Sequence, residues 1–313
     1  MKKNQWKILS SLLLCFVFLF MSCSHKVSIK SIKDYIEEDF SFVEDIAENI
    51  NNVSRWHTSD VFLEGQDADC FGGYTALFYS DFGVSIKDMR TNRFVSGKVF
   101  GDRNIVPHCN SVSFGNNFAD DGDCFPTIYV NAYNSYDLPL GTLFNCRLFQ
   151  LKNGCFEPRI IQTIHIDFVD DLNMWPDKSQ IRPFGNFAVN SDGFLYSYVP
   201  DDIKNLTRVY KFAIPPIKSN IVYLSKEDAL DYFEINYISI PQGCSIKNNY
   251  LFMLSGWGNN SLHGSIQVLN LNTKSVTNSF DFSGAGFFGE PEAVFFYENK
   301  MFVTLADKTY YFI

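Results

Sequence analysis

Residues 241–254 read Pro-Gln-Gly-Cys-Ser-Ile-Lys-Asn-Asn-Tyr-Leu-Phe-Met-Leu, a polar lead-in followed by a short apolar run. Two more runs rich in β-branched and apolar residues follow at 264–270 and 275–282, and the turn Leu271-Asn272-Thr273-Lys274 separates them. Short β-rich runs at this spacing indicate strands joined by hairpins. The stretch 241–282 therefore predicts one four-stranded antiparallel sheet.

The same polar lead-in recurs along the chain. Gln242 stands eight residues before Tyr250, and the equivalent residues elsewhere are Gln66, Asn110, Asn186 and Glu292. The intervals between successive lead-ins are 44, 76, 56 and 50 residues. Sheet units repeated about every 40–50 residues are typical of propeller blades. The sequence therefore predicts an all-β propeller over 56–313, with five blades favoured over six, since the long interval has room for an insertion or a degenerate sixth blade.

Closure of the ring has to involve the N-terminal side of the domain. The last unit shows only three strands before Ile313. Closure removes exposed strand edges, so a further strand is needed to complete the last blade. We expect it within 56–63.

The first 22 residues have the pattern of a signal peptide. Lysines at 2, 3 and 7 precede an apolar run of about 14 residues, shorter than the roughly 20 that a spanning helix needs. Phe20-Met21-Ser22-Cys23 resembles a lipobox, although Phe20 and Met21 depart from its usual residues. We expect an exported lipoprotein, anchored in a membrane by palmitate and other acyl chains on Cys23. The alternative is an uncleaved anchor.

Residues 23–55 form the predicted lipidated tether. Apolar residues recur every three or four positions between Ile32 and Ile50, and this spacing predicts a helix over 31–50. Acidic residues occupy its other face. We favour a structural role for this helix, either packing on the domain or forming a partly ordered stalk.

Composition narrows the class of partner. The chain is 17% aromatic and 19% charged, with a net charge of −9, which indicates an ordered domain and argues against nucleic acid as a partner. After Cys23, six cysteines remain, at 70, 109, 124, 146, 155 and 244. They permit three disulfides in an oxidising compartment, or serve as small buried apolar residues.

Two short motifs resemble a known family. The lead-in Pro241-Gln242-Gly243 and the later Glu290-Pro291-Glu292-Ala293 look like those of TagC-like five-bladed propellers, found in teichoic-acid-associated and phage receptor-binding proteins. The resemblance covers roughly 60–313, and Ala293 stands where that family is expected to have Gly. The lipoprotein context resembles that of Bacteroidetes-type relatives. The resemblance implies recognition of glycans without a defined reaction.

The candidate site follows from the repeat. If each lead-in begins the innermost strand of its blade, its polar residues meet at one end of the axial channel. The candidates are Gln66, His108, Asn110, Asn186, Gln242, Glu290 and Glu292. Their amide and carboxylate oxygens suit a calcium ion at the axis or the hydroxyl groups of a sugar. The structural alternative is that they cap turns and one another around ordered water.

Catalytic motifs are absent from the sequence, which has no P-loop, no G-x-S-x-G and no H-E-x-x-H. The leading hypothesis is a non-catalytic lipoprotein whose propeller face binds a glycan or another component of the cell envelope. Trp175 and Trp257, in loop-like contexts, would stack on sugars if exposed. One alternative is a carbohydrate-active hydrolase or lyase, or a metal-dependent lactonase, with Glu290, Glu292 and His108 as acid and base groups. Another is a structural partner in an outer-membrane complex.

The lipidation hypothesis predicts the behaviour of Cys23→Ala. This variant should accumulate as unprocessed precursor and should lose metabolic labelling with palmitate, because the thiol that carries the lipid is gone. Cys15→Ala, inside the predicted signal peptide, is the control and should label normally. Labelling that persists in Cys23→Ala contradicts the assignment.

Overall fold

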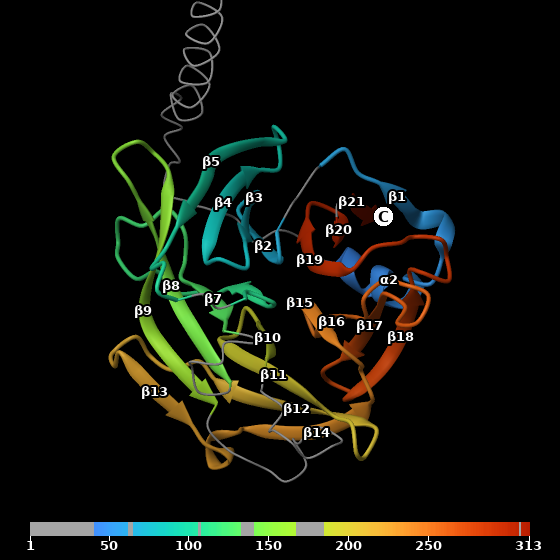
Figure 1. The fold of residues 1–313 in the computed structure, drawn as a ribbon. Coiled ribbons are helices and arrows are strands. Elements are labelled where there is room, and N and C mark those ends of the chain that lie inside the picture. Colours follow the sequence, from blue (N-terminus) through green and yellow to red (C-terminus); the bar gives the residue numbers. More distant parts are fainter. Residues whose placement is uncertain (1–40, 62–64, 106–107, 133–140, 167–184, 307) are drawn as a thin grey trace, which may run out of the picture.

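The protein folds as a five-bladed β-propeller (Figure 1). The computed structural model describes residues 41–61, 65–105, 108–132, 141–166, 185–306 and 308–313. Within these residues the strands form five sheets arranged around one axis. The prediction of five blades is confirmed, and the described part of the long interval between Asn110 and Asn186 holds no sixth blade.

The innermost strands of the first three blades follow chain order. The first blade consists of β2 (Asp67–Phe71), β3 (Tyr74–Phe78), β4 (Gly83–Asp88) and β5 (Arg93–Phe100). The second consists of β6 (Val112–Phe114), β7 (Ile128–Asn131), β8 (Thr142–Gln150), β9 (Phe156–Ile166) and, outermost, β13 (Ile221–Leu224). The third consists of β10 (Asn186–Val189), β11 (Phe194–Asp201), β12 (Leu206–Ala213) and β14 (Asp231–Asn236).

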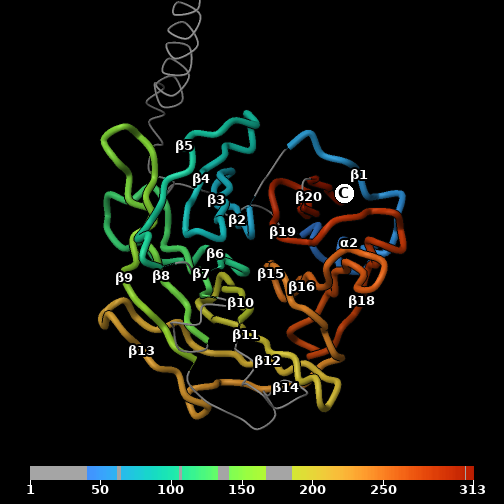
Figure 2. Tube along the Cα trace, viewed as in Figure 1, coloured from blue at the N-terminus to red at the C-terminus, as the bar shows by residue number. Residues whose placement is uncertain are grey.

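The last two blades complete the ring. The fourth blade consists of β15 (Pro241–Lys247), β16 (Tyr250–Ser255), β17 (Ser265–Asn270) and β18 (Ser275–Asp281). The fifth consists of β19 (Pro291–Tyr297), β20 (Lys300–Leu305), β21 (Lys308–Phe312) and β1 (Trp56–Thr58). The innermost strands β2, β6, β10, β15 and β19 follow one another around the axis (Figure 2).

The hydrophobic core lies between the blades. Five clusters of buried apolar side chains each join two neighbouring blades. The cluster between the fifth and first blades, for example, contains Phe295 and Phe302 together with Ala68 and Leu77. A blade is apolar on both faces, so it is stable only with a neighbour on each side.

Side chains on the innermost strands take over hydrogen bonds that a continuous sheet would provide. Asp67 and Asp69 accept the backbone N–H groups of Val112 (2.6 Å) and Phe114 (2.8 Å) in the next blade. In the same way, Ser113 Oγ accepts the N–H of Val189 at 3.1 Å. Buried backbone N–H groups are costly without an acceptor, so these side chains stabilise the centre of the ring.

The closing strand is β1, as the sequence predicts. It pairs antiparallel with β21, with Trp56 opposite Phe312 and Thr58 opposite Tyr310. The Trp56 ring lies 5.1 Å from that of Phe280, and its indole N–H donates to the carbonyl of Ile50 at 3.0 Å. The ring is therefore closed by a strand from the start of the domain.

The predicted N-terminal helix is confirmed for its second half. Helix α2 (Phe42–Asn49) buries Val43, Ile46 and Ala47 in the same cluster as Trp56, so it is a packing helix. A short 3-10 turn, η2 (Val53–Arg55), leads into β1. Residues 1–40, which include Cys23 and the first half of the predicted helix, lie outside the described residues. No helix in the described ranges combines the length and apolar character needed to cross a bilayer.

The sequence does not predict which blade β13 joins. This strand lies between β12 and β14 in the chain, yet it pairs in parallel with β9 of the second blade. Gln162 of β9 donates to the carbonyls of Pro216 (3.0 Å) and Ser219 (3.2 Å) just before it. A short 3-10 helix, η4 (Lys226–Asp228), follows β13 and is capped by Ser225.

Disulfides are absent among the cysteines after Cys23. All six are buried and none is joined in a disulfide, so the disulfide alternative is wrong. Cys244, for example, donates its thiol to the carbonyl of Phe187 in the neighbouring blade at 3.0 Å. These cysteines therefore act as small packing residues.

Closure by β1 predicts a large effect of Trp56→Ala. Removing a buried aromatic side chain of this size costs about 3–5 kcal/mol, and here it also loosens the strand that closes the ring. Urea unfolding followed by circular dichroism should show this loss. His57→Ala, at an exposed position on the same strand, is the matched control and should cost less than about 1 kcal/mol. Equal effects of the two changes would contradict this role of Trp56.

Candidate functional site

The predicted site residues lie at the starts of the innermost strands, and we call this face of the channel the strand-start end. Asn186 begins β10, and Gln242 and Glu292 are the second residues of β15 and β19. The others lie just before such strands: Gln66 before β2, His108 and Asn110 before β6, and Glu290 before β19.

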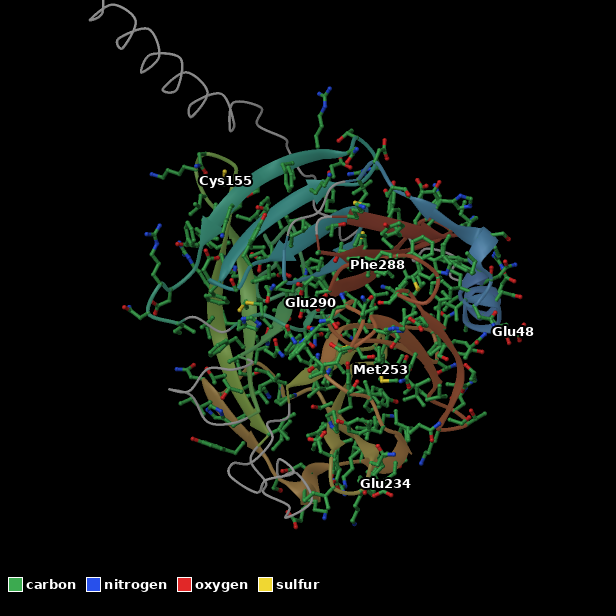
Figure 3. All side chains as sticks on the ribbon, turned by 45° about the vertical axis from the view of Figure 1, so that its right-hand side comes forward. Glu48, Cys155, Glu234, Met253, Phe288 and Glu290 are labelled. Atoms are coloured by element: carbon green, nitrogen blue, oxygen red, sulfur yellow. The ribbon has the colours of Figure 1, made fainter. Side chains whose placement is uncertain are left out.

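Four of these side chains take part in hydrogen bonds between neighbouring blades. Asn110 Nδ2 donates to the carbonyl of Pro241 at 3.2 Å, and Asn186 Nδ2 donates to the carbonyl of Gln242. Gln242 Nε2 in turn donates to Glu290 Oε1 at 2.6 Å. The two asparagines thus bind backbone groups of β15, as the structural alternative expects. Glu290 is the member of this set that lies toward solvent, and Figure 3 shows it near the middle of the ring.

A cluster of carboxyl groups lies beneath Glu290. Burial raises the pKa of Glu292 to about 8, and the charge of Glu290 adds to this shift. Burial also raises the pKa of Asp67 well above its usual range, with the charges of Asp69 and Glu292 contributing. Like charges close together in a poorly hydrated site favour protonation. At neutral pH the cluster therefore holds Glu292 mainly as a neutral carboxylic acid.

Gly243 makes this arrangement possible. A Cβ atom at residue 243 would lie 2.1 Å from the carbonyl oxygen of Glu292 and 2.7 Å from Asp67 Oδ1. No other residue fits such a close approach. The Pro-Gln-Gly lead-in therefore brings β15 against both β19 and Asp67.

Two exposed aromatic side chains border this cluster, and we call Trp257 and Phe288 the aromatic pair. Their exposed fractions are 49% and 58%. Trp257 is flanked by Gly256, whose carbonyl accepts from Gln242 Nε2 at 3.4 Å, and by Gly258. The N–H of Gly289, next to Phe288, donates to the carbonyl of Gly258 at 3.4 Å.

Glycine fixes these two loops. Gly256, Gly258 and Gly289 have φ values of +88°, +62° and +125°, which side chains rarely adopt. A Cβ on Gly258 would lie 1.8 Å from the carbonyl oxygen of Gly289. The two loops that carry the aromatic pair are therefore in close backbone contact beside Glu290. Figure 3 labels Phe288 close to Glu290.

Gln66 and His108 lie at the same end but contribute differently. Both side chains are half-buried. The backbone N–H of Gln66 donates to the carbonyl of Phe78 at 2.8 Å. Burial lowers the pKa of His108.

A metal site is not formed by the residues that the structure describes. Among them, no group of three or more His, Cys, Asp or Glu side chains is arranged to hold an ion. The oxygens of Asp67 accept the N–H groups of Ala68 (2.8 Å) and Val112 (2.6 Å). The residues present therefore do not favour calcium at the axis.

Sequence reasoning missed part of this end. Phe288 was not singled out, although it stands between Gly286 and Gly289 in a loop directly before Glu290. Trp257 was singled out as a loop residue, while Trp175 lies outside the described residues. A cavity of about 270 Å³ opens at the other end of the channel, and none of the seven predicted residues lines it.

Comparison with known proteins identifies no family for this chain. No family model and no curated protein matches the chain. Among solved structures, a glutaminyl cyclase from Myxococcus xanthus is similar over 82% of this chain and 94% of its own, at 9% identity and a TM-score of 0.46. Part of a mitotic checkpoint complex is similar over 78% of this chain and 58% of its own, at 13% identity and a TM-score of 0.33. A designed protein, Ika8, is similar over 82% of this chain and 100% of its own, at 10% identity and a TM-score of 0.36.

These likenesses are too distant to carry an activity from one protein to another. The fold and the site together define a five-bladed β-propeller whose channel mouth combines buried carboxyl groups with exposed aromatic rings.

The carboxyl cluster predicts how stability depends on pH. The pKa of Glu292 is about 8 in the folded chain and near 4.5 when unfolded, so between these values the folded state binds more protons. Stability should therefore fall as pH rises from about 5 to 8, by on the order of a few kcal/mol in total. Glu292→Gln removes the titrating group and should flatten this part of the curve.

The measurement is urea unfolding of both proteins between pH 5 and 9. The variant should gain stability over the wild type as pH rises. Glu227→Gln, at an exposed position, is the control and should follow the wild-type curve. If the curves of wild type and Glu292→Gln stay parallel, Glu292 is not a buried neutral acid.

Proposed function

We propose that this protein binds a glycan of the cell envelope at the strand-start end. The observation that carries the proposal is the aromatic pair, held beside Glu290 and Gln242 at the mouth of the channel. A single exposed aromatic ring needs no explanation, but two on loops that touch each other beside polar groups form a patch of the kind that ligand sites have.

The chemistry of the two parts is complementary to a sugar. A pyranose has faces of C–H groups and an edge of hydroxyl groups. Aromatic rings bind the apolar face, while carboxylate and amide groups accept and donate hydrogen bonds at the edge. The carboxyl cluster would repel an acidic sugar, so the proposed ligand is a neutral glycan.

The cellular setting is also part of the proposal. The lipobox-like motif at Cys23 supports an exported, membrane-anchored lipoprotein. The resemblance to TagC-like propellers, which implies glycan recognition, agrees with a ligand in the envelope. A lipid on Cys23, before the helix that packs against β16 and β18 of the fourth blade, would hold the domain close to such ligands.

One observation favours a second candidate, a carbohydrate-active hydrolase or lyase. Glu292 has its pKa raised to about 8 beside Glu290. A pair of carboxyl groups, one protonated and one charged near pH 7, is what acid–base cleavage of a glycosidic bond needs. Prolonged incubation of a bound glycan with wild type and with Glu292→Gln separates the two candidates, since only an enzyme releases shorter products, and only with Glu292 intact.

The binding proposal predicts the effect of removing the aromatic pair. Trp257→Ala and Phe288→Ala should each weaken binding of a neutral glycan, identified on a glycan array, by about tenfold, because an aromatic contact contributes on the order of 1 kcal/mol. Isothermal titration calorimetry gives the dissociation constants.

Phe94→Ala is the matched control, because Phe94 is an aromatic residue of similar exposure (47%) on β5, the outermost strand of the first blade. It should bind the glycan as the wild type does. Glu292→Gln should also weaken binding more than Asp121→Asn, a change at an exposed loop acid. Unchanged affinity in both Trp257→Ala and Phe288→Ala contradicts the proposal.

A further inference from the structure

A cavity of about 270 Å³ opens at the second mouth of the channel, and we call it the strand-end pocket. It is lined by the last residues of β2, β6, β10 and β15 and by the turns that follow them. The inner strand β2 spans five residues, so the pocket lies roughly 16 Å from the strand-start end. The glycan site proposed above therefore does not include it.

The wall of the pocket is apolar and aromatic. Phe71 and Phe114, from neighbouring blades, lie with ring centroids 5.6 Å apart and planes tilted by 46°. Val189, Ile246 and Phe296 complete the wall, and all three are buried. Sites for small organic ligands are lined mainly by apolar and aromatic side chains of this kind.

The two charged groups in the lining offset each other. Asp69 accepts the N–H groups of Cys70 and Phe114, each at 2.8 Å, and so ties β2 to β6. Burial raises the pKa of Asp69, and the positive charge of Lys247 opposes this shift. Lys247 also has an interaction of its own within the fold. A charged ligand would therefore enter the pocket without a counter-ion, which is costly, whereas an uncharged ligand would not.

The rim carries hydrogen-bonding groups that the fold leaves open. Asn116 Nδ2 donates to the carbonyl of Ser191 at 3.0 Å, and this bond ties together the turns that follow β6 and β10. Asn190 Oδ1 accepts the N–H of Phe194 at 2.9 Å. Each asparagine thus uses one end of its amide. Within the described residues, Asn116 Oδ1 and Asn190 Nδ2 have no protein partner.

These two open groups belong to the same part of the rim. Asn190 directly precedes Ser191, whose carbonyl binds Asn116. An acceptor and a donor on neighbouring residues are complementary to an amide whose N–H and C=O lie on one edge of a ring. A ring amide of this kind is uncharged, and its flat ring fits an aromatic wall.

We propose that the strand-end pocket binds a small uncharged compound in which a planar ring carries an amide. The amide bonds to Asn116 and Asn190, and the ring lies against the aromatic wall. The volume is below the roughly 300–1,000 Å³ of pockets for drug-sized ligands, so the ligand has one ring or two fused rings. This site is separate from the proposed glycan site and does not depend on it.

Oxindole, a fused ring with such an amide, is the test ligand. Titrations followed by NMR of the isotope-labelled protein should show saturable binding. N-methyloxindole lacks the N–H and should bind about tenfold more weakly, because it leaves the acceptor of Asn116 unpaired. Two ions of similar size, indane-2-carboxylate and 2-aminoindane, should each bind at least tenfold more weakly than oxindole.

Three outcomes of these titrations would overturn the proposal. The first is tighter binding of either ion than of oxindole. The second is equal affinity for oxindole and N-methyloxindole. The third is the absence of saturable binding of oxindole.

A change at Asn190 tests the donor. Asn190→Asp keeps an oxygen for the N–H of Phe194 but replaces the donor with a second oxygen, so it should weaken oxindole at least tenfold. Asn153→Asp is the matched control, because Asn153 Oδ1 accepts the N–H of Cys155 at 3.1 Å in an exposed turn outside the pocket. This control should bind oxindole as the wild type does.

A change at Ser191 tests the place of binding. Ser191 is exposed at the rim, so Ser191→Trp should fill the mouth of the pocket and abolish oxindole binding. Ser219→Trp is the matched control: Ser219 is also exposed, and its carbonyl also accepts from a side-chain amide, but it lies outside the lining. Circular dichroism checks that each variant keeps its fold.

The two proposed sites can be told apart with the aromatic-pair variant. Trp257→Ala should bind oxindole as the wild type does, whatever its effect on a glycan. Unchanged oxindole affinity in both Asn190→Asp and Ser191→Trp would show that the compound binds elsewhere and would overturn the assignment.

Discussion

The structure depends on side chains that accept backbone N–H groups from the next blade at the centre of the ring. Neighbouring inner strands approach the axis without a shared ladder of backbone hydrogen bonds, so their buried N–H groups need other acceptors. Asp67 and Asp69 provide them for β6, and Ser113 does so for β10. Because these residues alternate along their strands, each blade is held in one register against the next.

This constraint accounts for what the sequence predicts well. Each polar lead-in precedes or begins the innermost strand of one blade, so the recurrence of Gln66, Asn110, Asn186, Gln242 and Glu292 reports the number of blades. The closing strand at Trp56 is predictable for a related reason, since a ring with one incomplete blade has an exposed edge. Asp67-Ala68-Asp69, with polar residues alternating in a buried strand, is a signal for the junction that was available in the sequence.

Other features depend on contacts between distant parts of the chain. Four residues at 221–224 fit an outer strand, but nothing in them indicates that the partner is β9 in the preceding blade. The exposure of Phe288 depends on how Gly258 packs against Gly289, and the cavity at the other end of the channel arises only where turns from several blades meet. The state of the cysteines also depends on distances in the folded chain, because an even number of them permits disulfides without requiring any.

The carboxyl cluster at the axis lowers the stability of the fold while providing groups that are suited to binding or catalysis. A buried glutamic acid beside two other carboxyl groups opposes folding at neutral pH, whereas an amide in its place would not. Groups of this kind are concentrated at functional sites in proteins. The strand-start end combines such a group with exposed aromatic rings, and the five clusters of apolar side chains between the blades offset its cost.

The strand β13 also has a mechanical consequence. Most neighbouring blades of this ring are joined only through side chains, which pack together and form hydrogen bonds with backbone groups of the next blade. The second and third blades, by contrast, share a length of backbone: the segment that leaves β12 pairs with β9 and then returns to β14. These two blades must open together, and their outer amide groups should exchange with solvent as one unit. On heating, the ring would then open first between two neighbouring blades that share no such backbone segment, such as the fifth and the first.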